Sequence, residues 1–466
     1  DIKVNRSENR SRSENESHRY HWAMGVMRRL NEKGTTLGLN IQNSDSWGNN
    51  ESFSLSETTY FRLKDKNGND SVLYRNQYLK SPQRNNSWRV GLSFTQPVGK
   101  KVRLRVAYNW STRYERSNRD TYELSSLASS DIYGELPSGY EAGYVDSLSN
   151  RSHSRSNGHD LNVGVNYSDD TWMFNASLGV TPQRRTIDRK VGKLYADTAM
   201  NMIDFQPMIW MSWRKKEMRV SLNYNGNTRQ PSLSDLMPLT DNSNPLYITR
   251  GNPDLKQMFS HNIRLNFQNS PKGISANLGG QVEQNSVTQV MIYDVQTGGR
   301  ETYPVNINGN WNLFGGASWW KRFGHFSLRL DMSGNHSNRV GMINEDKSLQ
   351  PEKSTTRDTG LNCEAQASYQ PSWGGIDLST SWNYQYSLNS LNDNDTYTRY
   401  YNFGLNGYVD FPFGLQLRTD ATYNLRSGTN IQKGEDDEIL WNVGATWRFL
   451  KKKEAELSAY WADILG

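Results

Sequence analysis

The sequence predicts an all-β fold, a large antiparallel β-barrel, and three observations lead to it. Apolar and polar residues alternate with a period of two, in segments of about ten residues, along almost the whole chain. Stretches with helical spacing are scarce, and no run approaches the roughly 18 apolar residues that a membrane-spanning helix needs. Short and long polar connections alternate between the segments, as in hairpins that turn tightly at one end only.

Composition excludes several other classes of protein. The 466 residues include 12% aromatic side chains, far more than a disordered chain carries. The single cysteine, Cys363, excludes an internal disulfide framework. The 54 basic and 48 acidic residues leave a net charge of only +6, too balanced to indicate binding of nucleic acid.

The strand segments have one apolar and one polar face. In residues 88–94, Trp88, Val90, Leu92 and Phe94 lie on one face, and smaller or polar side chains lie on the other. The same alternation recurs in residues 102–110, 161–167, 263–267, 326–331 and 415–421. Cys363 also alternates with apolar positions and is expected on the apolar face.

The connections indicate which ends of the hairpins are short. Tight turns are expected at residues 31–34, 97–100, 168–170, 214–217, 270–273, 322–324, 371–374, 411–414 and 451–453. Long loops are expected at residues 43–86, 111–157, 184–202, 229–258, 285–308 and 336–357. Outer-membrane barrels have short periplasmic turns and long extracellular loops, because a sheet in hydrocarbon must close on itself to pair its backbone groups.

We therefore predict that residues 1–466 form one transmembrane barrel domain of the outer-membrane type, with lipid outside and a polar lumen. About 18 barrel strands are expected here, of 22 in the full protein. An extra hairpin is expected at residues 53–78, inside the first long loop. Outer-membrane barrels end in a strand with a terminal aromatic residue, so at least one closing strand is expected to be missing.

Charged residues on the polar face are the candidate sites. These positions alternate with apolar ones and are Arg103, Arg105, Arg264, Arg329, Arg418 and Asp420. They are candidates for contact with a domain inside the lumen or with an anionic solute. The alternative is a solvated or mutually paired lumen wall.

No motif predicts chemistry or a cofactor. A nucleophile elbow, a glycine-rich phosphate loop and a cysteine with a histidine partner are all lacking, and the seven histidines have no zinc spacing. Residues 65–70 contain pieces of a calcium loop without its distal glutamate, and Asn67-Gly68 predicts a tight turn instead. We expect no enzyme activity, no cofactor and no metal.

Residues 229–258 carry a recognisable motif. It reads R-x-P-S-x-x-x-L from Arg229 and Pro231, then N-P-L at Asn244 and Pro245, then G-N-P-x-L-K at Gly251, Asn252 and Pro253. This loop resembles the signature loop of TonB-dependent receptors, in the form found in the outer membrane β-barrel family of Bacteroidetes. Residues 449–458 are similar to the penultimate turn and strand of that family. The loop either closes over a ligand or uses its prolines merely to fix turns.

The resemblance implies a receptor in the outer membrane of a Gram-negative bacterium that takes up a siderophore, glycan, peptide or similar solute. The implied partners are membrane lipids, an N-terminal plug domain of the same protein and, through the plug, the TonB complex. Nucleic acid is not among them. No plug-like region or TonB box precedes the strands, so the chain is expected to be a barrel fragment. The alternatives are a structural or secretion-related barrel that imports nothing, and a soluble β-rich binding protein.

Overall fold

The computed structural model describes residues 3–125, 127, 133–237, 240–241, 246–344, 351–391, 395–429, 431, 437–450 and 454–465. These residues form 22 strands joined in one sheet, with very little helix. Within this part of the chain, no helix has the length and hydropathy needed to cross a membrane. The predicted all-β, antiparallel fold of the outer-membrane type is confirmed.

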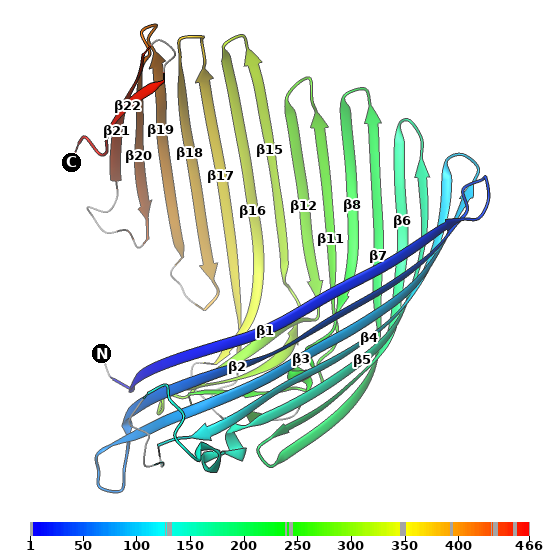
Figure 1. The fold of residues 1–466 in the computed structure, drawn as a ribbon, viewed down its shortest axis with the longest axis vertical. Coiled ribbons are helices and arrows are strands. Elements are labelled where there is room, and N and C mark those ends of the chain that lie inside the picture. The colour runs from blue at the N-terminus through cyan, green and yellow to red at the C-terminus, as the bar shows by residue number, and fades with distance from the viewer. Residues whose placement is uncertain are drawn as a thin grey trace.

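Eighteen of these strands follow one another in chain order around a strongly curved sheet, which we call the wall (Figure 1). Each wall strand pairs antiparallel with the next. The first half comprises β1 (Asn5–Arg29), β2 (Thr36–Lys64), β3 (Asp70–Val98), β4 (Val102–Glu123), β5 (Asn150–Ser168), β6 (Trp172–Val191), β7 (Leu194–Lys215), β8 (Met218–Arg229) and β11 (Met258–Asn269). The second half comprises β12 (Ile274–Gln284), β15 (Trp311–Phe323), β16 (Phe326–Asn344), β17 (Glu352–Tyr369), β18 (Gly374–Asn389), β19 (Thr396–Asp410), β20 (Leu415–Gly428), β21 (Asp437–Phe449) and β22 (Ala455–Trp461).

The wall is open between its first and last strands. Among the described residues, β1 pairs only with β2, and β22 pairs only with β21. The two chain ends lie apart in Figure 1, with β1 crossing in front of the other strands. The wall is therefore a curved sheet with two free edges.

The remaining strands and the short helices lie in the connections. They are β9 (Thr240–Asp241), β10 (Tyr247–Arg250), β13 (Ser286–Tyr293) and β14 (Arg300–Ile307), with the helix α1 (Leu233–Leu236) and the 3-10 turns η1 (Tyr140–Gly143) and η2 (Asp146–Leu148). β13 and β14 form a hairpin, which joins β10 on one side and the end of β16 on the other through parallel pairs. We call residues 286–307 the crossbar.

The outer face of the wall carries a continuous apolar band. Leu39, Leu92 and Tyr108 lie opposite one another on β2, β3 and β4, and Leu92 is 50% exposed. Cys363 lies on this face, opposite Met332. Large apolar side chains on an exposed face match the lipid surface of a membrane barrel. The other face, which we call the inner face, is polar.

The first predicted loop, residues 43–86, is instead a paired hairpin. The ladder of β2 and β3 runs from Thr36 opposite Thr95 to Lys64 opposite Asp70, with one register shift near its tip. The hairpin predicted at residues 53–78 is present, with Phe53 opposite Tyr78, but it continues this ladder and is not a separate element. Once two strands are paired in the membrane, each further residue pair adds backbone hydrogen bonds without a new loop-closure cost.

The tip of this hairpin is built by an aspartate. The carboxylate of Asp65 accepts hydrogen bonds from the backbone N–H groups of Asn67 (2.8 Å) and Asn69 (2.9 Å). Gly68 has a φ of 83°, which favours glycine at this position. The tight turn predicted at Asn67-Gly68 is confirmed, and the pieces of a calcium loop serve as turn residues.

The other long connections also contain strand. Within residues 111–157 the ladder persists to the end of β4 and resumes with β5, and nearly all of residues 184–202 belong to β6 and β7. Residues 336–357 overlap β16 and β17. In residues 229–258 and 285–308, small inward elements take the place of longer wall strands. We call the end of the wall that carries these connections the distal end.

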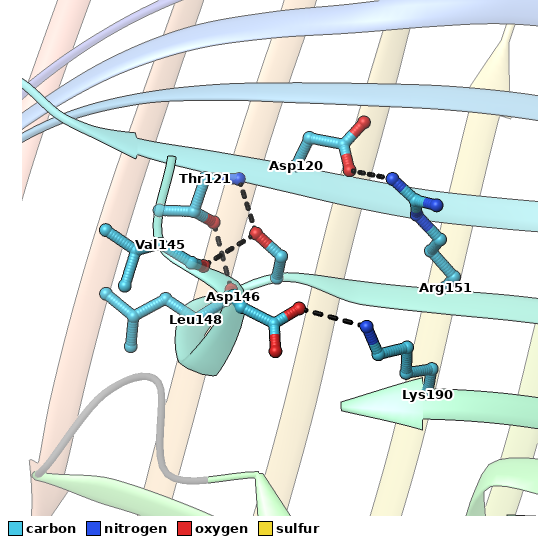
Figure 2. A network of polar contacts seen from close by, with 8 residues as sticks. Asp120, Thr121, Val145, Asp146, Leu148, Arg151 and Lys190 are labelled. Carbon is cyan, nitrogen blue, oxygen red and sulfur yellow. Dashed lines mark hydrogen bonds and ion pairs between the residues drawn. The ribbon is translucent and has the colours of Figure 1, made fainter. Parts of the chain in front are cut away.

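A buried polar knot fixes the connection between β4 and β5 (Figure 2). The Thr121 backbone N–H donates to the Ser149 hydroxyl (2.9 Å), which donates in turn to the Val145 carbonyl (2.8 Å). The Thr121 hydroxyl donates to the Leu148 carbonyl at 2.9 Å. Two ion pairs flank the knot, Asp120 with Arg151 (3.4 Å) and Asp146 with Lys190 (3.1 Å).

An aromatic cluster covers the outer side of the same region. Tyr78 is only 1% exposed, and its ring lies 5.2 Å from Phe53, 5.8 Å from Tyr122 and 5.5 Å from Tyr140. Burial raises the pKa of the Tyr78 hydroxyl well above its usual range. The long hairpins therefore have a small core of their own beyond the apolar band.

Candidate functional site

The family-like motif folds into a compact platform at the distal end, which we call the signature loop (residues 229–258). Its helix α1 is capped by Ser232, whose hydroxyl oxygen accepts a hydrogen bond from the Asp235 backbone N–H at 3.1 Å. The same hydroxyl donates to the Asp235 carboxylate at 2.6 Å. The predicted P-S segment therefore starts a one-turn helix, because serine satisfies an N–H that the helix leaves unpaired.

A small apolar core attaches the signature loop to the wall. Met237 is fully buried, and Leu236 and Leu255 are 3% and 6% exposed. They pack with Ile187 and Val191, which lie on the inner face of β6. The signature loop thus lies against the inner face and does not extend outward from the rim.

The second half of the motif joins the signature loop to the crossbar. The Asn252 side-chain amide donates to the Pro304 carbonyl (2.9 Å), and the Asn306 side chain bonds both the N–H and the carbonyl of Lys256 (2.6 and 2.9 Å). Gly251 lies so close to Met237 that a Cβ atom would meet its carbonyl oxygen at 1.9 Å. The G-N-P-x-L-K sequence is therefore a docking segment, in which glycine permits the close approach.

The remaining motif residues have separate positions. Arg229 ends β8 opposite Met258, and Pro231 is buried directly before the helix cap. Pro253 is exposed at the turn into the docking segment. Asn244 and Pro245 lie outside the described residues.

The crossbar reaches across the distal end to the first strands of the wall. Near its tip, the carbonyl of Thr297 accepts a hydrogen bond from the Asn5 side chain at 2.7 Å, and the carbonyl of Val295 accepts one from the Arg62 guanidinium. An ion pair between Arg250 and Glu301 (2.9 Å) reinforces the parallel pair of β10 and β14. The crossbar therefore connects β16 with β1 and β2.

Polar cavities lie at the distal end, and two of them are large. The first, of about 1010 Å³, spans the inner face of β1–β6 and is closed on one side by Ser232 and Ser234 of the signature loop. We call it the basic cavity, because the charged side chains that project into it from the inner face are Arg19, Arg185, Arg189 and Glu115.

The second cavity, of about 700 Å³, lies along β12 and β15–β19. Its charged lining residues are Glu283, Arg339 and Asp358. Asp358 accepts from Arg339 (2.6 Å) and from the Ser387 hydroxyl (2.7 Å). The carboxylates outnumber the guanidinium in this second cavity, so its charge is opposite in sign to that of the basic cavity.

The charged residues predicted for the lumen lie on the inner face but form no single site. Arg103 and Arg105 share a hollow with Asn175 and Trp210 near the short turns. The other four lie on three further strands, β11, β16 and β20. Their contacts are Arg264 over the Phe314 ring at 5.0 Å, Arg329 paired with Asp331 at 2.6 Å, Asp420 accepting from Asn442 at 2.6 Å, and Arg418 beside Gly444. Three of these groups thus have partners within the wall.

Sequence reasoning missed the arginines of the basic cavity. Arg185 and Arg189 fall in residues 184–202, where the sequence predicts a loop. Arg19 falls in a polar stretch without apolar alternation. The spacing of Arg185, Ile187 and Arg189 is a signal that was available, because alternate residues of a strand share one face. Using that signal would have required knowing that strand pairing continues beyond the apolar band.

Comparison with curated proteins finds no match. Among solved structures, the chain is similar to the outer membrane transporter YddB from Escherichia coli, with 9% identity, a TM-score of 0.35, and coverage of 96% of this chain and 72% of that one. It is also similar to the copper transporter OprC (10% identity, TM-score 0.36, coverage 98% and 75%). The siderophore receptor PirA from Pseudomonas aeruginosa matches at 11% identity, with a TM-score of 0.32 and coverage of 92% and 80%.

The family comparison is decisive, because it covers nearly the whole chain. The profile of the outer membrane protein beta-barrel family matches residues 28–466. That range includes β2–β22, the signature loop and the crossbar. The chain is therefore an outer-membrane β-barrel protein and belongs to the outer membrane protein beta-barrel family.

Proposed function

We propose that the chain is the barrel of a TonB-dependent receptor, which takes up a solute captured at the cell surface. The observation that carries this proposal is the inward folding of the distal connections. The signature loop and the crossbar both lie against the inner face and leave two polar cavities there. The motif between Arg229 and Lys256 supports the same proposal.

The proposed mechanism assigns binding and positioning to the chain and no covalent chemistry. The cavities at the distal end hold the solute, which belongs to the class of siderophores, glycans, peptides or similar compounds. A plug domain of the same protein contacts the polar inner wall, with Arg103 and Arg105 among the contacts, and moves when the TonB complex pulls it from the periplasm. Lipids surround the apolar band.

Uptake by intact cells tests this proposal. The gene for the full protein is deleted in one strain, and TonB is inactivated in a second strain. Both strains and the parent grow on a complex medium, and the solutes left in the medium are measured by mass spectrometry. We expect at least one solute to remain in the medium of both mutant strains and to disappear from the medium of the parent.

Complementation makes the test specific. Wild-type protein must restore depletion of that solute, and a variant without residues 286–307 must not, although it reaches the outer membrane. If the deletion strain depletes every solute normally but loses proteins from its outer membrane, the chain is an anchoring or secretion-related barrel and the proposal fails.

A further inference from the structure

The basic cavity has an excess of positive charge on its inner face. Arg19, Arg185 and Arg189 project into it from β1 and β6, and Glu115 of β4 is the acidic side chain among the inner-face residues that line it. The other inner-face side chains are almost all uncharged hydrogen-bonding groups, mostly serine and asparagine, such as Ser17, Asn50, Gln83, Asn150 and Ser152.

Glu115 does not neutralise these three arginines, because it is already engaged. Its carboxylate pairs with Arg113, the neighbouring inner-face residue of β4, at 2.5 Å. Arg113 also donates to the Asn85 side chain at 3.2 Å. The positive charge of Arg19 and Arg185 therefore remains.

Arg185 is the most constrained of the three. Its charged neighbours are Glu115, Arg113 and Asp204, and none of the described residues forms an ion pair with it. The Asp204 carboxylate accepts hydrogen bonds from the side chains of Gln183 (2.7 Å) and Gln230. Burial lowers the pKa of the Arg185 guanidinium, yet arginine remains charged in proteins. A partly desolvated cation without a counterion is unfavourable, and a bound anion would offset that cost.

The position of these arginines is fixed by the wall and the signature loop together. Ile187, between Arg185 and Arg189 on the same face of β6, packs against the core that contains Met237. Ser232 and Ser234 of the signature loop close the cavity beside them. The guanidinium groups are therefore held on a strand that tertiary packing keeps in place.

We propose that the basic cavity binds a hydrophilic solute that carries carboxylate or phosphate groups, with Arg19 and Arg185 as its anion ligands. A guanidinium group matches a carboxylate or a phosphate with two parallel hydrogen bonds. The surrounding serine, asparagine and glutamine side chains suit the hydroxyl groups of such a solute. This inference rests on the proposed function only in treating the solute as cargo.

Binding to the purified protein in detergent tests the inference. Isothermal titration calorimetry is performed with glucose 6-phosphate and citrate as acidic probes and with glucose as the neutral probe. We expect saturable binding of at least one acidic probe, weaker binding at higher salt, and no binding of glucose. Arg185→Gln and Arg19→Gln, on opposite sides of the cavity, should each weaken that binding about tenfold or more.

Arg184→Gln is the matched control, because Arg184 is the next residue of β6 and lies on the outer face. It removes the same charge and should leave the affinity unchanged. If Arg184→Gln weakens binding as much as Arg185→Gln, the anion lies on the outer surface, as a lipid phosphate would, and the inference is wrong. Saturable binding of neither acid also overturns it. Heat-modifiable gel migration must show that every variant is folded.

The two proposals fail in different ways. Acid binding in detergent does not depend on uptake, so acid binding together with normal depletion of every solute by the deletion strain overturns the transport proposal alone. If cells import only uncharged solutes through this protein, the proposed solute class is wrong and the transport function stands.

Discussion

The N-terminal and C-terminal halves of the wall are alike at the apolar band and differ in the distal region. Leu92 on β3 and Leu378 on β18 occupy equivalent outer-face positions, and each is 50% exposed. In contrast, β2 and β3 have 29 residues each, whereas β20 and β21 have 14 and 13. At about 3.3 Å per residue, the difference amounts to roughly 50 Å of strand. The membrane therefore dictates the band, and the distal architecture varies independently of it.

The long side of the wall must stabilise strands that no membrane surrounds. It uses the Thr121 knot, the aromatic cluster around Tyr78 and the core around Met237. The basic cavity lies among these three features, and the cavity of opposite charge lies on the shorter side. Four predictions test this division between an apolar band that both halves of the wall share and a distal region in which they differ.

The largest effect is expected at the core of the signature loop. Met237→Ala removes a fully buried side chain, and a substitution of this kind costs about 2–5 kcal/mol. We expect residues 229–258 to detach locally, while the band keeps the wall intact. Limited proteolysis should then cut this segment faster, with unchanged heat-modifiable migration.

Leu194→Ala is the control for that experiment, because Leu194 is 55% exposed at the tip between β6 and β7. It should not alter the cleavage rate. If Met237→Ala instead abolished the heat shift of the whole protein, the distal region and the band would be one cooperative unit, and the division would fail.

The second prediction tests the similarity of the band at the two ends. Leu92→Arg and Leu378→Arg each place a charge on the lipid face, at a cost of about 2–4 kcal/mol near the membrane centre. We expect both variants to reduce the folded fraction in lipid vesicles to a similar extent. The readout is the proportion of heat-modifiable protein after refolding.

The neighbouring residues provide matched controls on the opposite face. Ser93→Arg and Ser379→Arg introduce the same side chain one position away, on the inner face. They should refold almost normally. Equal damage from both members of a pair would show that the two faces are assigned incorrectly.

The third prediction concerns the polar knot. Ser149→Ala leaves the Thr121 N–H without its hydrogen-bond partner in a buried site, which costs about 1–3 kcal/mol. We expect faster hydrogen exchange in residues 140–149 and no change in the band. Ser147→Ala, at an exposed position in the same turn, is the control. Identical exchange in the two variants would contradict the role of the knot.

The smallest effect is expected at a short turn. The Asp169 carboxylate accepts hydrogen bonds from the Tyr167 hydroxyl (2.6 Å) and from the N–H groups of Trp172 and Thr171 (2.7 and 2.9 Å), and these bonds hold its pKa far below 3.8. A lowered native pKa stabilises the fold fully above the unfolded value, and this stabilisation is lost as the pH falls through the native value.

Asp169→Asn should therefore unfold at a slightly lower temperature than the wild type at pH 7. The difference should persist to about pH 5 and shrink only below pH 3.8. Thermal melts followed by gel migration across this pH range measure it. If the difference in unfolding temperature disappeared between pH 7 and pH 5, a group other than Asp169 would be its cause.

The band was predictable because lipid imposes a strict alternation, which residues 88–94 display clearly. The length of the strands was not, because residues 43–52 and 80–87 are almost all polar and interrupt the apolar alternation. Their pairing follows from the ladder that starts in the membrane and from the turn at Asp65. The local sequence therefore does not show how far the strand pairing extends beyond the membrane.

The signature motif was predictable as a unit but not in its contacts. Ser232 as a helix cap follows the general preference for serine at that position. The contact of Gly251 with Met237 and the bonds of Asn306 to Lys256 join segments that are distant along the chain, so single-sequence patterns do not reveal them. The basic cavity was missed for the same reason, since its arginines come from β1 and β6.

The contact between Asn5 and Thr297 also bears on the order of folding. It joins residues 292 positions apart. Closing so long a loop in an unfolded chain is entropically costly, whereas neighbouring hairpins close cheaply. The contact therefore forms late, after the intervening strands have paired and shortened the effective path. A fluorophore pair at positions 5 and 297 would report completion of the assembly, at a time when the spectroscopic signal of β-structure has already reached its final value.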